Sequence, residues 1–397
     1  MAVSSRTLKN QTVARRWAFW TTGGVDKPLF LLISCLGLIL AGLAGLDTGL
    51  TGLALVGLGL LLGMAFMGFQ YGFASGWRRF LETGDASALS LHFLLAALCA
   101  LIFIPVSAAG LGPSGSLAPV SVSLFIGAFM FGTGMQLANG CGSGVLFSFG
   151  GGSGRMIVAL PFFVFGSVLG SIILPPVLAW GSLGQIEIGG GLSGAGKLAV
   201  NLVLLLGAAV FFRWLSVRRG FQINRTMLVA TLLIAVLCWG VFWVSKHPWG
   251  VTFGFTLWGA KIASAAGVPI EDFAFWTWPG PRRALTHSVF SDTSSLMGFA
   301  MIIGAGLTAA LTGAFAKSAW PNARQLQAAA LGGVLMGIGA RLSFGCNIGA
   351  FLAGTASGSL HGWIWFALAL AGSVLGIRLR AKFGFQCHEH ATDHIKS

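Results

Sequence analysis

The chain contains 397 residues, of which 55% are hydrophobic and 9% are charged, and it carries a formal net charge of +14. Soluble domains contain about 25% charged residues, so this composition excludes a soluble globular protein. The basic residues stand at the edges of hydrophobic runs and form no single patch, which argues against a nucleic-acid partner. The composition therefore predicts an all-α, polytopic membrane protein in contact with the lipid bilayer.

Ten apolar segments are each about as long as a helical membrane crossing, which needs ~20 residues. In chain order, these segments are 28–46, 49–70, 89–111, 119–139, 156–178, 196–216, 226–245, 295–316, 325–343 and 361–380. Four further segments are too glycine-rich, too polar or too short for a complete crossing: 71–84, 140–155, 250–290 and 344–359. Because irregular backbone survives at membrane depth only inside protein or along a cavity, we expect re-entrant half-helices in these segments.

The predicted segments divide the chain into five parts. They are a cytoplasmic N-terminal tail (1–25), a first membrane half (26–178), connecting spans and loops (179–249), a second membrane half (250–381) and a cytoplasmic C-terminal tail (382–397). Because lysine and arginine concentrate in cytoplasmic loops, the basic clusters place both termini in the cytoplasm, provided that 250–290 makes no net crossing. The basic tail runs into an apolar segment that is too long for a signal peptide. We therefore expect a multi-pass protein of the cell inner membrane with no cleaved leader.

The two halves contain copies of one sequence unit, at the offset between the two cysteines, which is 346 − 141 = 205 residues. This offset pairs Gly127, Gly132, Gly134, Leu137, Gly140, Cys141 and Gly144 with Gly332, Gly337, Gly339, Leu342, Gly345, Cys346 and Gly349. The turn between segments 89–111 and 119–139 has no basic residue, whereas the equivalent turn carries Lys317 and Arg324. The two turns should then face opposite sides of the membrane. We expect two inverted repeats, a plan that recurs in secondary transporters.

Each copy contains a cysteine inside a glycine-rich interruption, NGCGSG at 139–144 and FGCNIG at 344–349, here named the first and second helix breaks. Glycine costs ~1 kcal/mol relative to alanine inside a helix, so these segments should end one helix and start another. Amide groups at the start of a helix suit an anion, and a thiol adds a soft donor and acceptor. The candidate substrate-binding residues are therefore Gly140, Cys141, Gly142, Gly345, Cys346 and Asn347. The alternative is that both cysteines only fill helix contacts, as buried free cysteine commonly does.

Arg341 and Gln136 occupy equivalent positions shortly before the two helix breaks. An arginine inside a membrane segment usually faces the protein interior and marks a pathway, although it can also serve as a structural partner of backbone carbonyls. Gln136 is either a polar residue of the path or a hydrogen-bonding contact between helices. Both residues are further candidates for substrate binding.

The tracts GTGMQLANGCGSG (132–144), GIGARLSFGCNIG (337–349) and GFASGWRRFLETGD (72–85) resemble the YeeE/YedE family of sulfur-transport membrane proteins. The resemblance covers both repeats. It implies an hourglass-shaped helical shell with inverted halves that takes up a small sulfur-containing anion, thiosulfate being the best-known substrate. It also implies that family cysteines on a central path contact the anion, and by position two of them are Cys141 and Cys346.

One position departs from the family pattern. A third family cysteine precedes the arginines of the tract at 72–85, and this chain has Gly72 there, between Tyr71 and Phe73. Either Tyr71 or free backbone amides near Gly72 replace the missing thiol, or the substrate is a selenium compound, sulfite or another sulfur species.

Other functions are weighed against transport. The chain has no C-x-x-C or haem-attachment motif, so we expect no catalytic residue, but an intramembrane thiol enzyme for sulfur transfer is the main alternative and a structural subunit the third. No ATP-binding loop is present, and we expect no cofactor. The C-terminal tail collects Cys387, His388, His390 and His394, whose spacing matches no zinc site, so we expect no metal. A soluble sulfur-carrier protein is a candidate cytoplasmic partner, although no motif in the tail specifies one.

Overall fold

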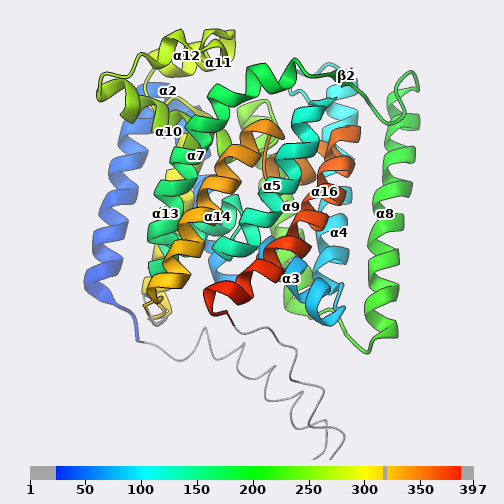
Figure 1. The fold of residues 1–397 in the computed structure, drawn as a ribbon, viewed down its shortest axis with the longest axis horizontal. Coiled ribbons are helices and arrows are strands. Elements are labelled where there is room, and N and C mark those ends of the chain that lie inside the picture. The colour runs from blue at the N-terminus through cyan, green and yellow to red at the C-terminus, as the bar shows by residue number, and fades with distance from the viewer. Residues whose placement is uncertain (1–23, 316–319, 386–397) are drawn as a thin grey trace, which may run out of the picture.

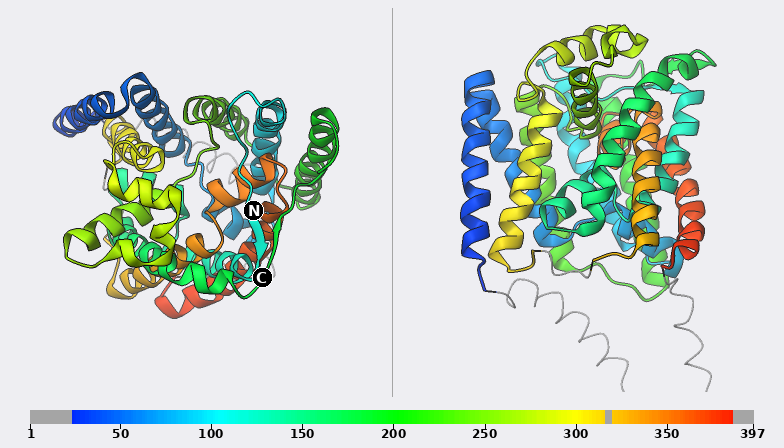
Figure 2. Two further views of the ribbon diagram at one scale, coloured as in Figure 1. Left: turned by 90° about the horizontal axis from the view of Figure 1, so that it is seen from above. Right: turned by 60° about the vertical axis from the view of Figure 1, so that its left-hand side comes forward.

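The computed structural model describes residues 24–315 and 320–385, which form a bundle of helices (Figure 1). Within these residues, nine continuous helical stretches are long and apolar enough to cross a membrane. The first stretch holds two crossings, because α2 (Lys27–Phe69) breaks at Gly49, where φ is 63° and ψ is −141°. Its two arms lie side by side (Figure 2), and a Cβ built on Gly45 would lie 3.4 Å from Leu53. The prediction of an all-α membrane protein with about ten crossings is thus confirmed for the described residues.

The other long helices are α4 (Ser87–Ala108), α5 (Val122–Ala138), α7 (Gly154–Leu178), α8 (Gly194–Arg218), α9 (Arg225–Ser245), α13 (Thr293–Leu311), α14 (Ala323–Leu342) and α16 (Leu360–Arg380). The half-helices are α3 (Phe73–Thr83), α6 (Gly142–Gly150), α10 (Thr252–Ala265) and η3 (Asn347–Leu352), which α15 (Ala353–Ala356) continues. The small elements are η2 (Ile270–Asp272), α11 (Ala274–Thr277), α12 (Pro279–Thr286), η4 (Ala381–Phe383), β1 (Pro119–Ser121) and β2 (Ser182–Gln185), of which β1 and β2 pair antiparallel. Half-helices thus occur in all four segments for which the sequence predicted them.

Polar side chains fix where several of these helices begin. Asn322 accepts a hydrogen bond from the Gln325 amide at 2.9 Å, and the Gln325 side chain accepts one from the Asn322 amide at 3.3 Å. Asp292 accepts from the Ser295 amide at 2.8 Å at the start of α13. Such caps satisfy amide groups that have no partner inside the helix, so the chain turns into α13 and α14 at defined residues.

The order of elements repeats in opposite orientation. The second arm of α2 is followed by a half-helix, two long helices, a half-helix and a long helix, and α9 is followed by the same series, interrupted by η2, α11 and α12. The connection between α4 and α5 lies at the upper end of the bundle in Figure 1, whereas the connection between α13 and α14 lies at the lower end. From this order we propose that the second unit includes α9, ahead of residue 250.

Glycines shared by the two repeats let the halves approach closely. A Cβ on Gly132 in α5 would lie 1.9 Å from the carbonyl oxygen of Ala369 in α16. Its repeat counterpart Gly337 in α14 would place a Cβ 2.4 Å from the carbonyl oxygen of Phe163 in α7. Because neither backbone oxygen can move out of the way, both contacts require glycine, and helix packing explains these motif positions.

Candidate functional site

The starts of three half-helices lie close to Cys346 of the second helix break. A Cβ built on Gly142, the first residue of α6, would lie 3.0 Å from the sulfur of Cys346 and 3.6 Å from Cγ2 of Thr252, the first residue of α10. A Cβ on Gly349, in η3, would lie 3.8 Å from Cα of Gly250. The starts of α6, α10 and η3 therefore meet around Cys346.

The start of the fourth half-helix, α3, lies close to Cys141 of the first helix break. Cys141 caps α6, because its sulfur accepts a hydrogen bond from the Gly144 amide at 3.4 Å and lies 3.4 Å from the hydroxyl of Ser143. The backbone amides of Phe73 and Ala74, in the first turn of α3, also interact with the Cys141 sulfur. The Cys141 thiol thus interacts with the starts of both α6 and α3.

The meeting of four helix starts has an electrostatic consequence. The N-terminus of a helix carries unpaired amides and roughly half a positive charge, which attracts anions. Cys141 is 1% exposed and Cys346 is fully buried, so the thiols face this meeting point and not lipid. Both are free thiols. The arrangement brings helix-start amides and two soft sulfur groups close together.

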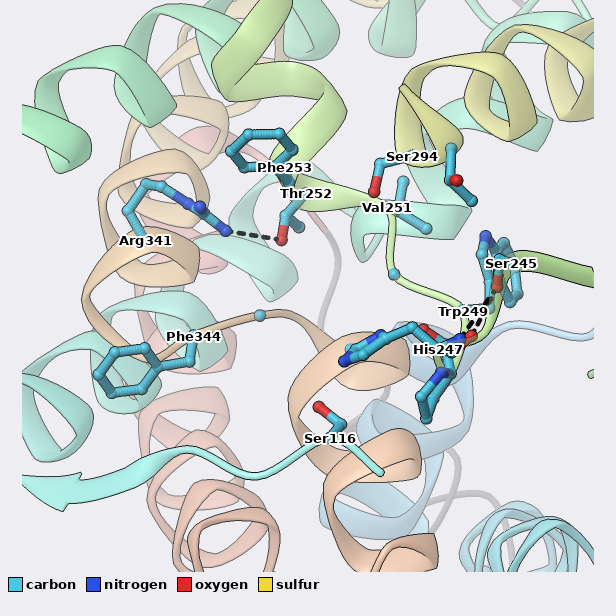
Figure 3. Close-up of a pocket in the computed structure, with 15 residues that line it drawn as sticks. Ser116, Ser245, His247, Trp249, Val251, Thr252, Phe253, Ser294, Arg341 and Phe344 are labelled. Atoms are coloured by element: carbon cyan, nitrogen blue, oxygen red, sulfur yellow. Dashed lines mark hydrogen bonds between the residues drawn. The ribbon is translucent and has the colours of Figure 1, made fainter. Parts of the chain in front are cut away.

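Arg341 lies beside the second helix break. This α14 residue is 9% exposed, and its Nη2 lies 3.5 Å from the hydroxyl oxygen of Thr252 (Figure 3). Its Cζ lies 5.8 Å from the ring centroid of Phe253 and 5.9 Å from that of Phe275. None of the described residues accepts a hydrogen bond from its buried Nε. The guanidinium therefore keeps donor capacity for an anion.

A cavity of about 210 Å³ leads to this arginine. Its lining contains five hydroxyl side chains and the ring of His247, and the hydroxyl residues are Ser116, Ser245, Thr252, Thr293 and Ser294 (Figure 3). The lining also includes Gly345 and Gly349, which flank Cys346 on either side along the chain. No residue of the first helix break lines this cavity. The cavity therefore adjoins the second helix break and not the first.

The model of the sulphur transport family matches residues 70–375, a range that contains all four half-helices and both helix breaks. The chain belongs to this family. The resemblance of the cysteine tracts to YeeE/YedE proteins is therefore confirmed, and the chain is a multi-pass membrane protein of a family of sulfur transporters.

Named relatives of this sulphur transport protein are described as transporters. It is 28% identical to the thiosulfate transporter TsuA of Spirochaeta thermophila over 77% of its own length and 92% of TsuA. It is also 32% identical to the probable transporter YedE of Escherichia coli and 33% identical to that of Salmonella typhimurium. These two matches span 38% of this chain but only 36% of each YedE protein. None of the three names describes an enzyme.

The remaining predicted site residues lie in different surroundings. Gln136 is fully buried, its Nε2 donates to the Ala74 carbonyl at 3.3 Å, and it does not line the cavity. Asn347 is fully buried next to Cys346, and neither of its amide atoms has a hydrogen-bond partner among the described residues. Gly140 ends the turn before Cys141, with Met156 packed 3.3 Å from its Cβ position. The role of each in binding substrate stays a prediction.

The two local replacements suggested for the missing third thiol lie in different surroundings. The Tyr71 hydroxyl accepts a hydrogen bond from Thr231 in α9 at 3.3 Å, and its ring lies edge-on to His92 in α4. Gly72, by contrast, stands directly before the α3 amides that face Cys141. The amides of Phe73 and Ala74 thus interact with the Cys141 sulfur, whereas the Tyr71 hydroxyl is hydrogen-bonded to Thr231, and the role of either in binding an anion stays a prediction.

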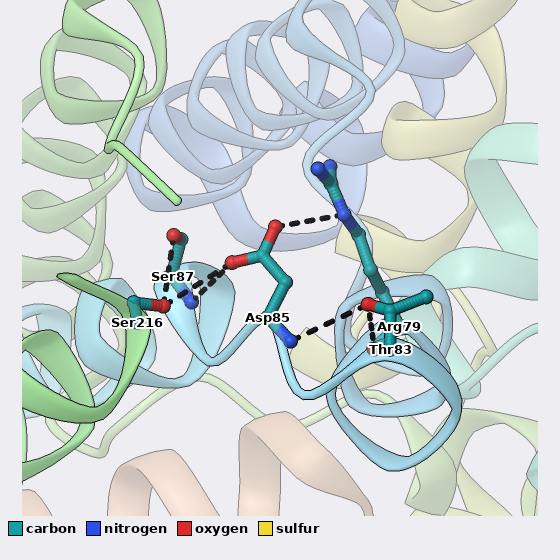
Figure 4. A network of polar contacts seen from close by, with 5 residues as sticks. All are labelled: Arg79, Thr83, Asp85, Ser87 and Ser216. Carbon is teal, nitrogen blue, oxygen red and sulfur yellow. Dashed lines mark hydrogen bonds and ion pairs between the residues drawn. The ribbon is translucent and has the colours of Figure 1, made fainter. Parts of the chain in front are cut away.

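A buried carboxylate holds α3 in place (Figure 4). Asp85 pairs with Nε of Arg79 at 2.8 Å, and its other oxygen accepts from the Ser87 amide at 3.0 Å and the Ser216 hydroxyl at 3.2 Å. The sequence gives no signal for Ser216, which comes from α8 and follows Asp85 by 131 residues. These bonds fix the outer end of α3, and so the direction in which its amides point.

Some predicted features lie outside the described residues. These are the tail residues Cys387, His388, His390 and His394. Within the described ranges, no group of three His, Cys, Asp or Glu side chains could hold a metal ion.

Proposed function

We propose that this protein is an inner-membrane permease that takes up a small sulfur-containing anion, with thiosulfate as the best candidate. The observation that carries the proposal is the meeting of four half-helix starts around Cys141 and Cys346, inside a chain whose family transports sulfur compounds. The likeness to TsuA along 92% of its length supports thiosulfate as the substrate.

The route that follows from the geometry begins in the cavity. Arg341 would attract the anion, because a guanidinium in a low-dielectric site interacts strongly with a negative charge. The anion then moves to the helix breaks, where Cys346 and Cys141 offer S–H donors next to unpaired amides. Contacts of this kind are individually weak, which suits transport because a solute that binds too tightly cannot leave.

The distribution of basic residues supports the proposed orientation. The lower end of the bundle in Figure 1 holds α3, the starts of α2, α7, α9 and α14, and the last turns of α8 and α16 with the residues that follow them. These segments contain Lys27, Arg78, Arg79, Arg155, Arg213, Arg218, Arg219, Arg225, Arg324, Arg378, Arg380 and Lys382. The upper end holds the start of α8, the connection after α9, α10 and α12, and these segments contain fewer basic residues, namely Lys197, Lys246, Lys261, Arg282 and Arg283. Since basic residues concentrate on the cytoplasmic side, the lower end of the bundle would face the cytoplasm, and the cavity would face the outside of the membrane. Both described chain ends lie at the lower end, so the termini would be cytoplasmic.

The test is uptake of radiolabelled thiosulfate into cells or membrane vesicles. We expect Cys141→Ser and Cys346→Ser each to lower uptake at least tenfold, because a hydroxyl keeps the hydrogen bond but loses the soft sulfur contact. Cys35→Ser is the matched control, since Cys35 is an exposed thiol of α2 away from both breaks. Unchanged uptake in both site variants would remove the thiols from the path.

The absence of the third family cysteine favours a second candidate, a selenium compound, sulfite or another sulfur species. Competition of unlabelled sulfite, sulfate and selenite against labelled thiosulfate separates the two. If one of these competes at a lower concentration than thiosulfate itself, that anion is the substrate. A cytoplasmic sulfur-carrier protein that receives the anion stays a prediction, and pull-down from cytosol on wild-type vesicles would check it.

A further inference from the structure

Three arginines lie together at the end of the bundle opposite the cavity. They are Arg78 of α3, Arg155 in the first turn of α7 and Arg380, the last residue of α16, here named the arginine cluster. Arg78 and Arg380 both donate to Oδ1 of Asn139, and Arg380 also donates to the Gln136 carbonyl at 2.6 Å. Arg155 lies close enough to Arg78 for the two charges to interact. The fold therefore gathers three guanidinium groups from separate helices.

Two members of the cluster form no ion pair with a carboxylate among the described residues. The ion pairs found in residues 24–315 and 320–385 involve Arg79 and Lys197, and include neither Arg78 nor Arg155. Glu82 acts on Arg78 through space without forming an ion pair with it. The buried Nε of Arg155 finds no acceptor among the described residues. Like charges in a partly buried place repel each other, and a bound anion relieves that repulsion.

The ring of Phe385 covers two of these groups. Its centroid lies 4.7 Å from Cζ of Arg155 and 4.2 Å from Cζ of Arg380. An aromatic face attracts a cation, but it accepts none of the directional N–H bonds that an oxyanion accepts. An oxyanion at this place would therefore replace the ring, which stands at the end of a short turn after η4.

The cluster adjoins the first helix break. Asn139 ends α5 in a left-handed conformation and precedes Cys141 by two residues along the chain. The Arg78 side chain that binds it belongs to the same half-helix whose first amides face the Cys141 sulfur. The cavity of Arg341 and the arginine cluster thus lie on opposite sides of the two thiols.

We propose that the arginine cluster is a second anion site, where a small oxyanion rests after it passes Cys141 and while Phe385 moves aside. The ligand class is a compact oxyanion with at least two oxygens, because the guanidinium fork binds two oxygens at once. The site deepens the proposed function and rests on it, since it lies on the path of the same anion. It gives the protein one cationic site on each side of the thiols.

The test compares KM values for thiosulfate measured from each side, in right-side-out and inside-out vesicles. Arg155→Gln should raise KM from the cluster side roughly tenfold or more, because a hydrogen bond to a charged group is lost, and should leave KM from the cavity side unchanged. Arg155→Lys should restore part of the loss, since it keeps the charge. The matched control is Arg378→Gln, an exposed arginine of α16 outside the cluster, which should change neither value.

A second variant removes the competing ring. Phe385→Ala should lower KM from the cluster side, because the anion no longer displaces an aromatic contact. An unchanged cluster-side KM in Arg155→Gln, or an equal rise on both sides, would overturn the second site. If wild-type vesicles carry no sulfur oxyanion at all, the proposed function fails instead. Calorimetric titration of sulfate into the purified full chain then tests the second anion site without transport. Equal sulfate affinity in wild type and Arg155→Gln would overturn this site.

Discussion

The two helix breaks share one sequence plan but differ in their surroundings. Cys141 caps a regular half-helix and receives amides from α6 and from α3. Cys346 makes no side-chain cap, precedes the π-helical turn η3 and lies between two glycines of the cavity lining. The duplicated motif thus supplies two equivalent thiols. The rest of the fold places Cys346 next to the cavity lining and Cys141 between the starts of α6 and α3.

The largest difference between the two helix breaks should appear in protein stability when the glycine before each cysteine is replaced by alanine. Gly345 has φ of 156°, in the region that favours glycine, and a Cβ there would lie 2.6 Å from the Ala350 nitrogen. Gly345→Ala should therefore lower the free energy of unfolding by about 1–3 kcal/mol and stop uptake. A Cβ on Gly140 would lie 3.3 Å from the flexible end of Met156 and 3.5 Å from the backbone carbon of Gly144, which is an ordinary contact distance. Gly140→Ala should therefore lower the free energy of unfolding by less than about 1 kcal/mol.

Thermal unfolding in detergent, together with vesicle uptake, measures both variants. The surface amounts of the two proteins provide the control for insertion. Equal melting temperatures for the two alanine variants would show that both helix breaks accept a Cβ at this position equally well. That result would contradict the difference between the two breaks.

Substitutions of Arg341 and Gln136 should change the KM for uptake by different amounts, and this difference is the intermediate one. Removing a charged donor from the cavity costs about 1.5–3 kcal/mol of binding, so Arg341→Gln should raise KM for uptake roughly tenfold to hundredfold. Gln136→Ala, which removes a neutral contact to the α3 backbone, should change KM less than about fivefold. Initial uptake rates over a range of thiosulfate concentrations give both values. A larger KM change in Gln136→Ala would place the main anion contact at the first break.

The smallest effect should follow from restoring the third family thiol. Gly72 has φ of −112° and ψ of 128°, which any residue adopts, and its Cβ position meets only the Ser75 hydroxyl, at 2.8 Å. Gly72→Cys should fold normally after Ser75 rotates, with a change in stability below about 1 kcal/mol. We expect it to favour thiosulfate over sulfite by a few-fold in competition assays, with Gly72→Ser as the control. An identical selectivity in both variants would mean that the α3 amides alone set the preference.

The sequence predicted the long helices well because a membrane crossing depends on local composition. Each of the ten predicted spans overlaps a long helix, and the hairpin at Gly49 was anticipated by the division between 28–46 and 49–70. The half-helices at the cysteine motifs followed from glycine content. The predicted ends of the spans were less accurate than their positions. The predicted span 119–139, for example, begins with a short strand, because Pro119–Ser121 pairs with β2.

The candidate site was only partly predictable. Cys141, Cys346 and Arg341 stood out because a motif recurred or because a charge interrupted an apolar run. The α3 amides and the start of α10 carry no side-chain signal, so only the packing of separate helices revealed them. The same holds for Arg155 and Arg380, which look like ordinary edge charges until Asn139 and Phe385 bring them together.

By itself, the sequence determined that this chain enters a membrane, that it carries a duplicated unit and that each copy interrupts a helix at a thiol. These properties depend on hydrophobicity and glycine content within a few turns of chain, so they can be read locally. Only the tertiary structure decided that four helix starts meet at one point and that cationic groups lie on both sides of it. Such convergence depends on contacts between segments far apart in the chain, such as the contact of Gly142 with Cys346, and these form only when the helices have packed against each other.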